Sequence, residues 1–176
     1  MTHFAARRPV AACLTLLLAV ALASLSACDG GGAKGSPGGL VGWEKGSAFD
    51  QKYNVAEFDK IKGYFVKISD VTPLPGMAEG SAVVLKDRAD GEPVTVIVGP
   101  SSFVHEDLEK LGLRDGERIN AYGAWTRLGD KDVLIATKIK KNEKEFLKVR
   151  RTKDGMPYWS MSKEDLAKER EAMADE

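Results

Sequence analysis

Apolar, β-branched and aromatic residues concentrate in five short segments of this chain, separated by glycine, proline and aspartate. The segments are residues 60–71, 82–86, 93–98, 118–127 and 132–140. Runs of this length and composition, bounded by turn residues, predict β-strands. Asp90-Gly91, between the second and third segments, is a strong hairpin sequence, so we expect these two strands to pair.

A helical spacing of apolar residues appears once within this series, between the third and fourth strands. Its apolar positions are Phe103, Val104, Leu108 and Leu111, with glutamate, aspartate and lysine between them. Such spacing predicts an amphipathic helix with one buried face. We expect Ser101 or Ser102 to cap its first turn and Gly112 to end it.

Five strands with one helix between the third and fourth predict an all-β fold, a small five-stranded OB-like Greek-key barrel. Gly63 and Gly123 stand where a barrel strand bends or coils. Another small β-barrel or a half-open sandwich is the alternative. After the barrel we expect a short extra strand around residues 146–149 and a C-terminal helix opened by Ser162.

The first 27 residues read as an export signal. Arg7 and Arg8 precede an apolar run over residues 10–25, and small residues follow. Leu25-Ser26-Ala27-Cys28 resembles the lipobox of bacterial lipoproteins, which implies cleavage before Cys28 and acylation of its thiol, for example by palmitate. More than one acyl chain gives stable membrane anchoring. An ordinary secretory peptide or an uncleaved membrane anchor is the alternative.

The rest of the chain divides into four parts. Residues 28–42 hold Cys28 and a glycine-rich tether, residues 43–60 a lead-in arm, residues 61–159 the barrel with its extension, and residues 160–176 an acidic terminal helix. The expected location is the cell envelope, with the lipid-anchored domain facing the periplasm. Asp29 favours the inner membrane by its resemblance to a retention signal, and the outer membrane is the alternative.

Charge gives little global indication of a partner, because 26 Lys and Arg balance 26 Asp and Glu. Removing residues 1–27 subtracts Arg7 and Arg8, leaving 24 minus 26, or −2. One basic strip, residues 138–153, stands out and could contact phosphate. Its candidate polyanion-binding residues are Lys138, Lys140, Lys141, Lys144, Lys148, Arg150, Arg151 and Lys153. The alternative is a solvated sheet edge guarded by lysines.

The sequence offers no recognisable catalytic or metal site, so we expect no enzyme, no metal and no cofactor. Only Cys28 remains after processing, and His105 is then the only histidine. His105, Glu106 and Asp107 are consecutive and cannot share one helix face, which makes them poor metal ligands. Neither a nucleophile elbow nor a second histidine for a triad is present.

A family resemblance rests on four stretches of the predicted barrel. They are VIVGPSSF before the helix, L-x-x-G-E-R-I-N-A-Y-G after it, VLIATKIKK in the fifth strand and FLKVRRTKDGMPYW beyond. Together they resemble the OB-like domain of the magnetosome-associated MamS and MamX proteins. The resemblance covers roughly residues 61–159 and implies the fold, with no catalytic residues.

These observations predict a membrane-anchored, non-catalytic OB-like binding or adaptor module whose partner is an envelope protein or peptide. Binding of an oligonucleotide or another polyanion is the alternative, and it ranks second. Strands two and three, where OB barrels often bind ligands, carry no aromatic residue and little positive charge. The sequence leaves the oligomeric state open.

Overall fold

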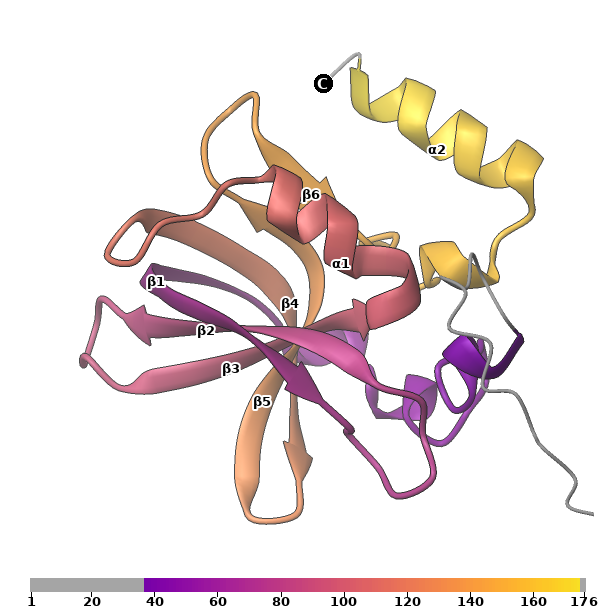
Figure 1. The fold of residues 1–176 in the computed structure, drawn as a ribbon, viewed down its shortest axis with the longest axis horizontal. Helices are drawn as coiled ribbons and strands as arrows, with labels where there is room; N and C mark the ends of the chain where they lie inside the picture. The colour runs from indigo at the N-terminus through magenta and orange to yellow at the C-terminus, as the bar shows by residue number, and fades with distance from the viewer. Residues whose placement is uncertain (1–36, 175–176) are drawn as a thin grey trace, which may run out of the picture. The chain divides into compact units, whose positions relative to one another are not determined.

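The computed structural model of the protein describes residues 37–174 (Figure 1). The predicted export signal, Cys28 and most of the tether lie outside the described residues. The regular elements are β1 (Phe58–Val71), β2 (Gly80–Asp87), β3 (Pro93–Pro100), α1 (Ser101–Lys110), β4 (Arg118–Leu128), β5 (Lys131–Lys140), β6 (Phe146–Lys148) and α2 (Lys163–Ala174). The five predicted strands, the helix between the third and fourth, the extra strand and the terminal helix are therefore confirmed.

The strands close into a barrel because each of β1 to β5 pairs with a neighbour on both edges. β1 pairs antiparallel with β2 and with β4, β2 pairs with β3, and β4 pairs with β5. A short parallel contact between β3 and β5, Val96 with Leu134 and Ile97 with Ile135, joins the two ends. The ring order β1-β2-β3-β5-β4, with α1 between β3 and β4, is that of an OB barrel, as predicted.

Three register shifts allow the strands to curve, and one of them lies in the pairing of β2 with β3, between Ser81 and Ala82. Pairing of β1 with β2 shifts register between Phe65 and Lys67, and pairing of β4 with β5 shifts between Tyr122 and Gly123. A Cβ at Gly123 would lie 2.2 Å from the carbonyl oxygen of Ile135, so only glycine lets the two backbones approach this closely. The expectation that Gly123 permits coiling is confirmed.

The barrel interior is filled by aliphatic side chains, and α1 packs over β2 and β3. Val104 and Leu108 of α1 are buried. The predicted serine cap is wrong: the N-cap position is Pro100, and no side chain caps the helix. Ser101 instead pairs with the Ser81 hydroxyl at 2.9 Å, and Ser102 donates to the carbonyl of Gly39 at 3.1 Å.

Aromatic residues from both flanks of the barrel meet beside α1. Trp43 and Phe49 of the lead-in arm are almost completely buried. The Trp159 indole N–H donates to the carbonyl of Trp43 at 2.6 Å, and the two rings meet edge to face with centroids 6.0 Å apart. Phe103 of α1 packs against Trp159 in the same manner at 5.9 Å. Trp43 and Phe49 of the arm and Trp159 beyond the barrel thus belong to one hydrophobic core.

Helix α2 begins where the sequence predicts. The Ser162 hydroxyl accepts a hydrogen bond from the Asp165 backbone N–H at 3.1 Å and donates to the Asp165 carboxylate at 2.9 Å. Glu169 of this helix accepts hydrogen bonds at 3.4 Å from Arg151 and from the Tyr158 hydroxyl. Across residues 37–174, none of the helices is both long and apolar enough to span a membrane.

Candidate functional site

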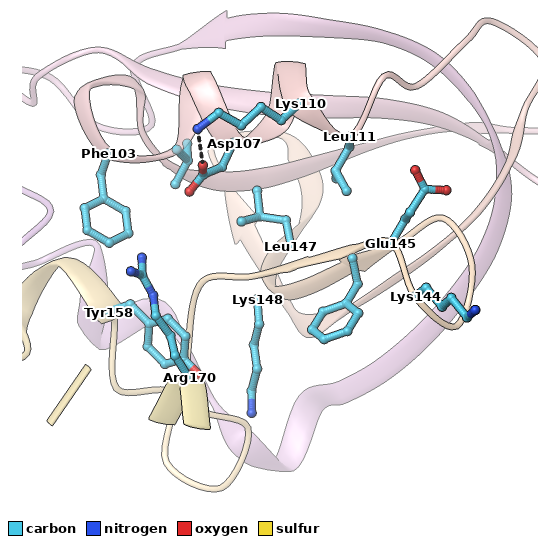
Figure 2. A pocket seen from close by; sticks show the side chains of 12 residues that line it. Phe103, Asp107, Lys110, Leu111, Lys144, Glu145, Leu147, Lys148, Tyr158 and Arg170 are labelled. Carbon is cyan, nitrogen blue, oxygen red and sulfur yellow. Dashed lines mark hydrogen bonds and ion pairs between the residues drawn. The ribbon is translucent and has the colours of Figure 1, made fainter. Parts of the chain in front are cut away.

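A groove of about 460 Å³ lies between α1, β6 and α2 (Figure 2). Its apolar lining comes from α1 and the residue after it, through Phe103, Val104 and Leu111, and from β6, through Phe146 and Leu147. Strand β6 alternates side-chain direction, and Figure 2 shows Leu147 pointing toward α1 while Lys148 points away from it. Tyr158, which precedes α2, and Arg170 of α2 lie together at one end of the groove, opposite Phe103 (Figure 2).

The rim of this groove carries more free positive than negative charge. Its two acids are engaged: Asp107 lies 3.3 Å from Lys110, and Glu145 lies 3.7 Å from Lys141. Lys110 also pairs with Glu106 at 2.8 Å, and the hydrogen bond from that pair raises the pKa of Lys110. By contrast, the rim cations Lys144, Lys148 and Arg170 form no ion pair with any residue that the structure describes.

The predicted basic strip does not form one surface. Lys138 and Lys140 project outward from β5 on either side of buried Ile139. The Lys138 ammonium lies 4.8 Å from the centroid of the Tyr122 ring, and Lys140 contacts Glu143 at 2.5 Å. Hydrogen bonding to that carboxylate raises the pKa of Lys140. These two lysines therefore lie on the outer face of the barrel.

The other strip residues separate into different environments. Lys141 turns toward the end of α1, where its ammonium donates to the carbonyl of Leu111 at 3.0 Å. Lys144 and Lys148 line the groove, and Lys153 is exposed. Arg151 binds Asp154, and hydrogen bonds from this guanidinium lower the pKa of Asp154 to about 2.

Arg150 requires a correction, because it cannot contact a polyanion. Its side chain is fully buried, and its guanidinium donates to Asp50 at 2.8 Å and to the carbonyl of Gly155 at 2.9 Å. It also lies 4.9 Å from the centroid of Trp159. Asp50 stands one hundred positions earlier in the chain. Arg150 is therefore buried against a carboxylate of the lead-in arm. The charge pattern of the neighbouring residues does not reveal this partner.

Four surface cations that the sequence analysis missed lie near Lys138 and Lys140. They are Lys60, Lys62, Arg88 and Arg118. Strand register brings them together: Lys60 faces Tyr122, which faces Lys138, and Lys62 faces Asn120, which faces Lys140. The alternation Lys60-Ile61-Lys62 was the one local indication of this basic face, since Ile61 is buried between two exposed lysines.

The remaining candidate, His105, lies on the surface of α1. Its imidazole is 3.4 Å from the Glu109 carboxylate, one helical turn away. Within the described part of the chain, no three His, Cys, Asp or Glu side chains are arranged to hold a metal ion. Cys28, the predicted lipidation site, lies outside the described residues. The expectations about catalysis, metal and lipidation stay predictions.

Two of the solved structures that resemble this chain are distant from it in sequence. A chain of the Stn1–Ten1 complex of S. pombe is 14% identical over 66% of this chain and 74% of that chain, with a TM-score of 0.35. The ZRD-deleted mutant of TiaS in complex with agmatine is 15% identical over 48% of this chain and 21% of that one, with a TM-score of 0.34. Among curated proteins, none matches the sequence significantly.

A family model gives the informative match. The MamS/MamX magnetosome protein family matches residues 57–146, which is just over half of the chain. The match begins one residue before β1 and ends at the first residue of β6, so it contains the whole barrel and α1. It also contains most of the sequence stretches on which the resemblance was based. The chain therefore belongs to the MamS/MamX magnetosome protein family.

Proposed function

We propose that this protein is a non-catalytic binding module of the bacterial envelope, anchored to a membrane through lipid on Cys28. Its groove between α1, β6 and α2 receives a short acidic segment of another envelope protein. The observation that carries the proposal is the combination of an apolar lining with three rim cations, Lys144, Lys148 and Arg170, that form no ion pair among residues 37–174.

The apolar lining supports a peptide or protein partner. Phe103, Phe146 and Leu147 are only partly buried, so an incoming apolar side chain would remove further apolar surface from water. Each square ångström so buried contributes about 25 cal/mol. Burial of one or two apolar side chains of the partner therefore contributes to binding affinity. The groove lies between two helices and a strand, and this shape fits a short segment of a partner chain.

The rim charges support an acidic partner in particular. A carboxylate brought beside Lys144, Lys148 or Arg170 would form a new ion pair without breaking an existing one, because Asp107 and Glu145 are already paired with other lysines. Rim charges of this kind act mainly on association rate and choice of partner. A basic or neutral segment would lack this advantage.

The experiment places a photo-crosslinker in the groove of the full chain in the cells that produce it. Replacing Phe146 with p-benzoylphenylalanine keeps an aromatic side chain and should yield a discrete adduct after irradiation. Mass spectrometry should locate the crosslink in an acidic segment that contains an apolar residue. The same replacement at Val55, an exposed residue outside the groove, provides the background.

Charge reversal then tests the rim. Lys144→Glu with Lys148→Glu should reduce the adduct at least about tenfold, because two attractive contacts become repulsive. Lys86→Glu with Lys131→Glu makes the same change of net charge at exposed positions outside the groove and should leave the adduct unchanged. An adduct that survives reversal of the rim, or that forms with a basic segment, would refute the proposed function.

A further inference from the structure

A second group of cations surrounds a pocket of about 340 Å³ on the outer face of β1 and β4. This cationic pocket is lined by Lys60 and Lys62 of β1, Arg88 of the β2–β3 turn, Arg118 of β4, and Lys141 after β5. None of these residues lines the groove. Gly63, Ile119 and Asn120 complete the lining, which includes no acidic and no aromatic residue.

Backbone pairing holds these cations in place. Lys60 and Lys62 share the outer face of β1, and their cross-strand partners on β4 are Tyr122 and Asn120. Arg118 lies two residues before Asn120 and therefore projects from the same face. The backbone N–H of Arg88 donates to the carbonyl of Lys62 at 3.0 Å, which fixes the β2–β3 turn against β1.

Few ion pairs compensate the positive charge in the pocket, although Asp59 and Asp87 line an adjoining pocket together with Lys60, Lys62 and Arg88. Lys141 has carboxylates nearby, Glu117 at 3.8 Å and Glu145 at 3.7 Å. The other four cations form no ion pair with any residue between 37 and 174. Glu143 lies close to this face but is bound to Lys140 and does not line the pocket. Four like charges brought together repel one another, and a bound anion would remove that repulsion.

We propose that the cationic pocket binds two phosphate groups, either of one small ligand or of neighbouring lipid headgroups, as a site separate from the groove. A phosphate monoester carries about −1.5 to −2 charge at neutral pH, so two such groups match the four cations that form no ion pair among residues 37–174. The guanidinium groups of Arg88 and Arg118 can each donate two parallel hydrogen bonds to phosphate oxygens. Asn120, which also lines the pocket, offers an amide donor.

The composition of the pocket lining favours a small ligand over a nucleic-acid strand. Proteins that bind single strands combine a basic groove with several aromatic platforms for stacking bases. Here the lining has no aromatic side chain, and the adjacent Tyr122 ring already has Lys60 at 5.1 Å and Lys138 at 4.8 Å from its centroid. The phosphate groups can come from a soluble diphosphate or from the headgroups of anionic phospholipids.

Isothermal titration of the full chain in nonionic detergent with inorganic pyrophosphate tests the proposal. We expect saturable binding at one site at low salt that weakens as ionic strength rises, because these cations are partly exposed. Lys62→Gln with Arg118→Gln should lower the affinity about a hundredfold, since each charged hydrogen-bond donor contributes about tenfold. Both residues are exposed, so the fold should persist in this variant.

The matched control removes two charges from the groove instead. Lys144→Gln with Lys148→Gln should leave pyrophosphate affinity unchanged, and Lys62→Gln with Arg118→Gln should leave the crosslink at Phe146 unchanged. Failure of one proposal is thereby separated from failure of the other. Equal affinity of the wild type and the Lys62→Gln, Arg118→Gln variant, or no binding at millimolar pyrophosphate and low salt, would overturn the site.

Two further arms identify the source of the phosphate. The full chain is placed in phosphatidylcholine vesicles, and phosphatidic acid is then added to the membrane. If lipid headgroups are the ligand, phosphatidic acid should compete with pyrophosphate for the pocket. If a soluble diphosphate is the ligand, phosphatidic acid should not change pyrophosphate binding. Either result supports a phosphate pocket, provided that the Lys62→Gln, Arg118→Gln variant abolishes binding. Competition by single-stranded oligonucleotides that strengthens with their length would instead overturn the small-ligand assignment.

Discussion

Arg150 and Arg151 are neighbours in the chain but lie in opposite environments. Arg150 is fully buried against Asp50, whose side chain is only 3% exposed, whereas the Arg151 and Asp154 side chains are 30% and 43% exposed. Burial opposes ionisation of Asp50, but the Gly46 N–H and the Arg150 guanidinium outweigh it and lower the pKa of Asp50. The same ion pair therefore has different consequences at the two sites, because water solvates only one of them.

Replacing Asp50 with asparagine should lower the free energy of unfolding by about 3 kcal/mol or more, because it leaves the buried charge of Arg150 without its counter-ion. Urea unfolding at neutral pH followed by tryptophan fluorescence measures this, since Trp43 and Trp159 are buried and the Trp159 ring lies beside Arg150. The matched control, Asp154→Asn, removes an exposed carboxylate from Arg151 and should cost no more than about 1 kcal/mol. Equal losses in the two variants would contradict this account.

The pH dependence of Asp50→Asn gives the same prediction a second readout. The pKa of Asp50 is lowered in the folded protein, so its stabilising contribution is present above the unfolded pKa of about 3.9 and is lost as pH falls through the folded value. The difference in stability between the wild type and Asp50→Asn should therefore be constant above about pH 5 and shrink below about pH 4.

At the scale of elements, the barrel depends on where β4 and β5 can approach each other. The register shift at Gly123 lets β4 coil, so that β4 can pair with β1 at one edge and with β5 at the other. A glycine within a β-rich segment could be identified from the sequence as a point of bending. The starts and ends of elements were harder to predict, because Ser101 and Ser102 have tertiary partners, Ser81 and Gly39, that compete with helix capping.

Gly123→Ala should destabilise the barrel by about 3 kcal/mol or more, since an added methyl would overlap backbone atoms of Ile135 that cannot move independently of β5. Thermal unfolding followed by circular dichroism measures the loss. Gly76→Ala is the control: its backbone has φ of +80° but a Cβ there meets no atom within 4 Å. It should cost only about 1 to 2 kcal/mol for the left-handed conformation. A smaller loss for Gly123→Ala than for Gly76→Ala would show that β4 and β5 can separate at little cost.

At the scale of the whole molecule, strands and their order were predictable because each depends on a local pattern and on turn residues. The candidate sites could not be predicted in this way, because each site brings together residues that are distant in the sequence. The strip at residues 138–153 looks continuous, yet Lys141 has its backbone partner thirty positions away and Arg150 has its carboxylate one hundred positions away. Conversely, Lys62 and Arg118 are far apart in the chain and meet only through the antiparallel register of β1 and β4.

The proposed attachment of the whole molecule to a membrane depends on Cys28, and Cys28→Ser should therefore release the protein into the soluble fraction. The physical reason is that a lipobox cysteine without its thiol cannot be acylated, and acyl chains supply about 0.8 kcal/mol of membrane affinity per buried CH₂ group. Cell fractionation and incorporation of labelled palmitate measure the effect, and Cys13→Ser, within the expected export signal, should change neither.

The membranes must be washed at high salt, because the cationic pocket could hold the domain on anionic lipid by attraction that salt screens. A Cys28→Ser protein that stays with the membrane only at low salt would be consistent with lipid anchoring of the wild type together with weak electrostatic adsorption. One that resists the wash would show that lipid on Cys28 is not the anchor.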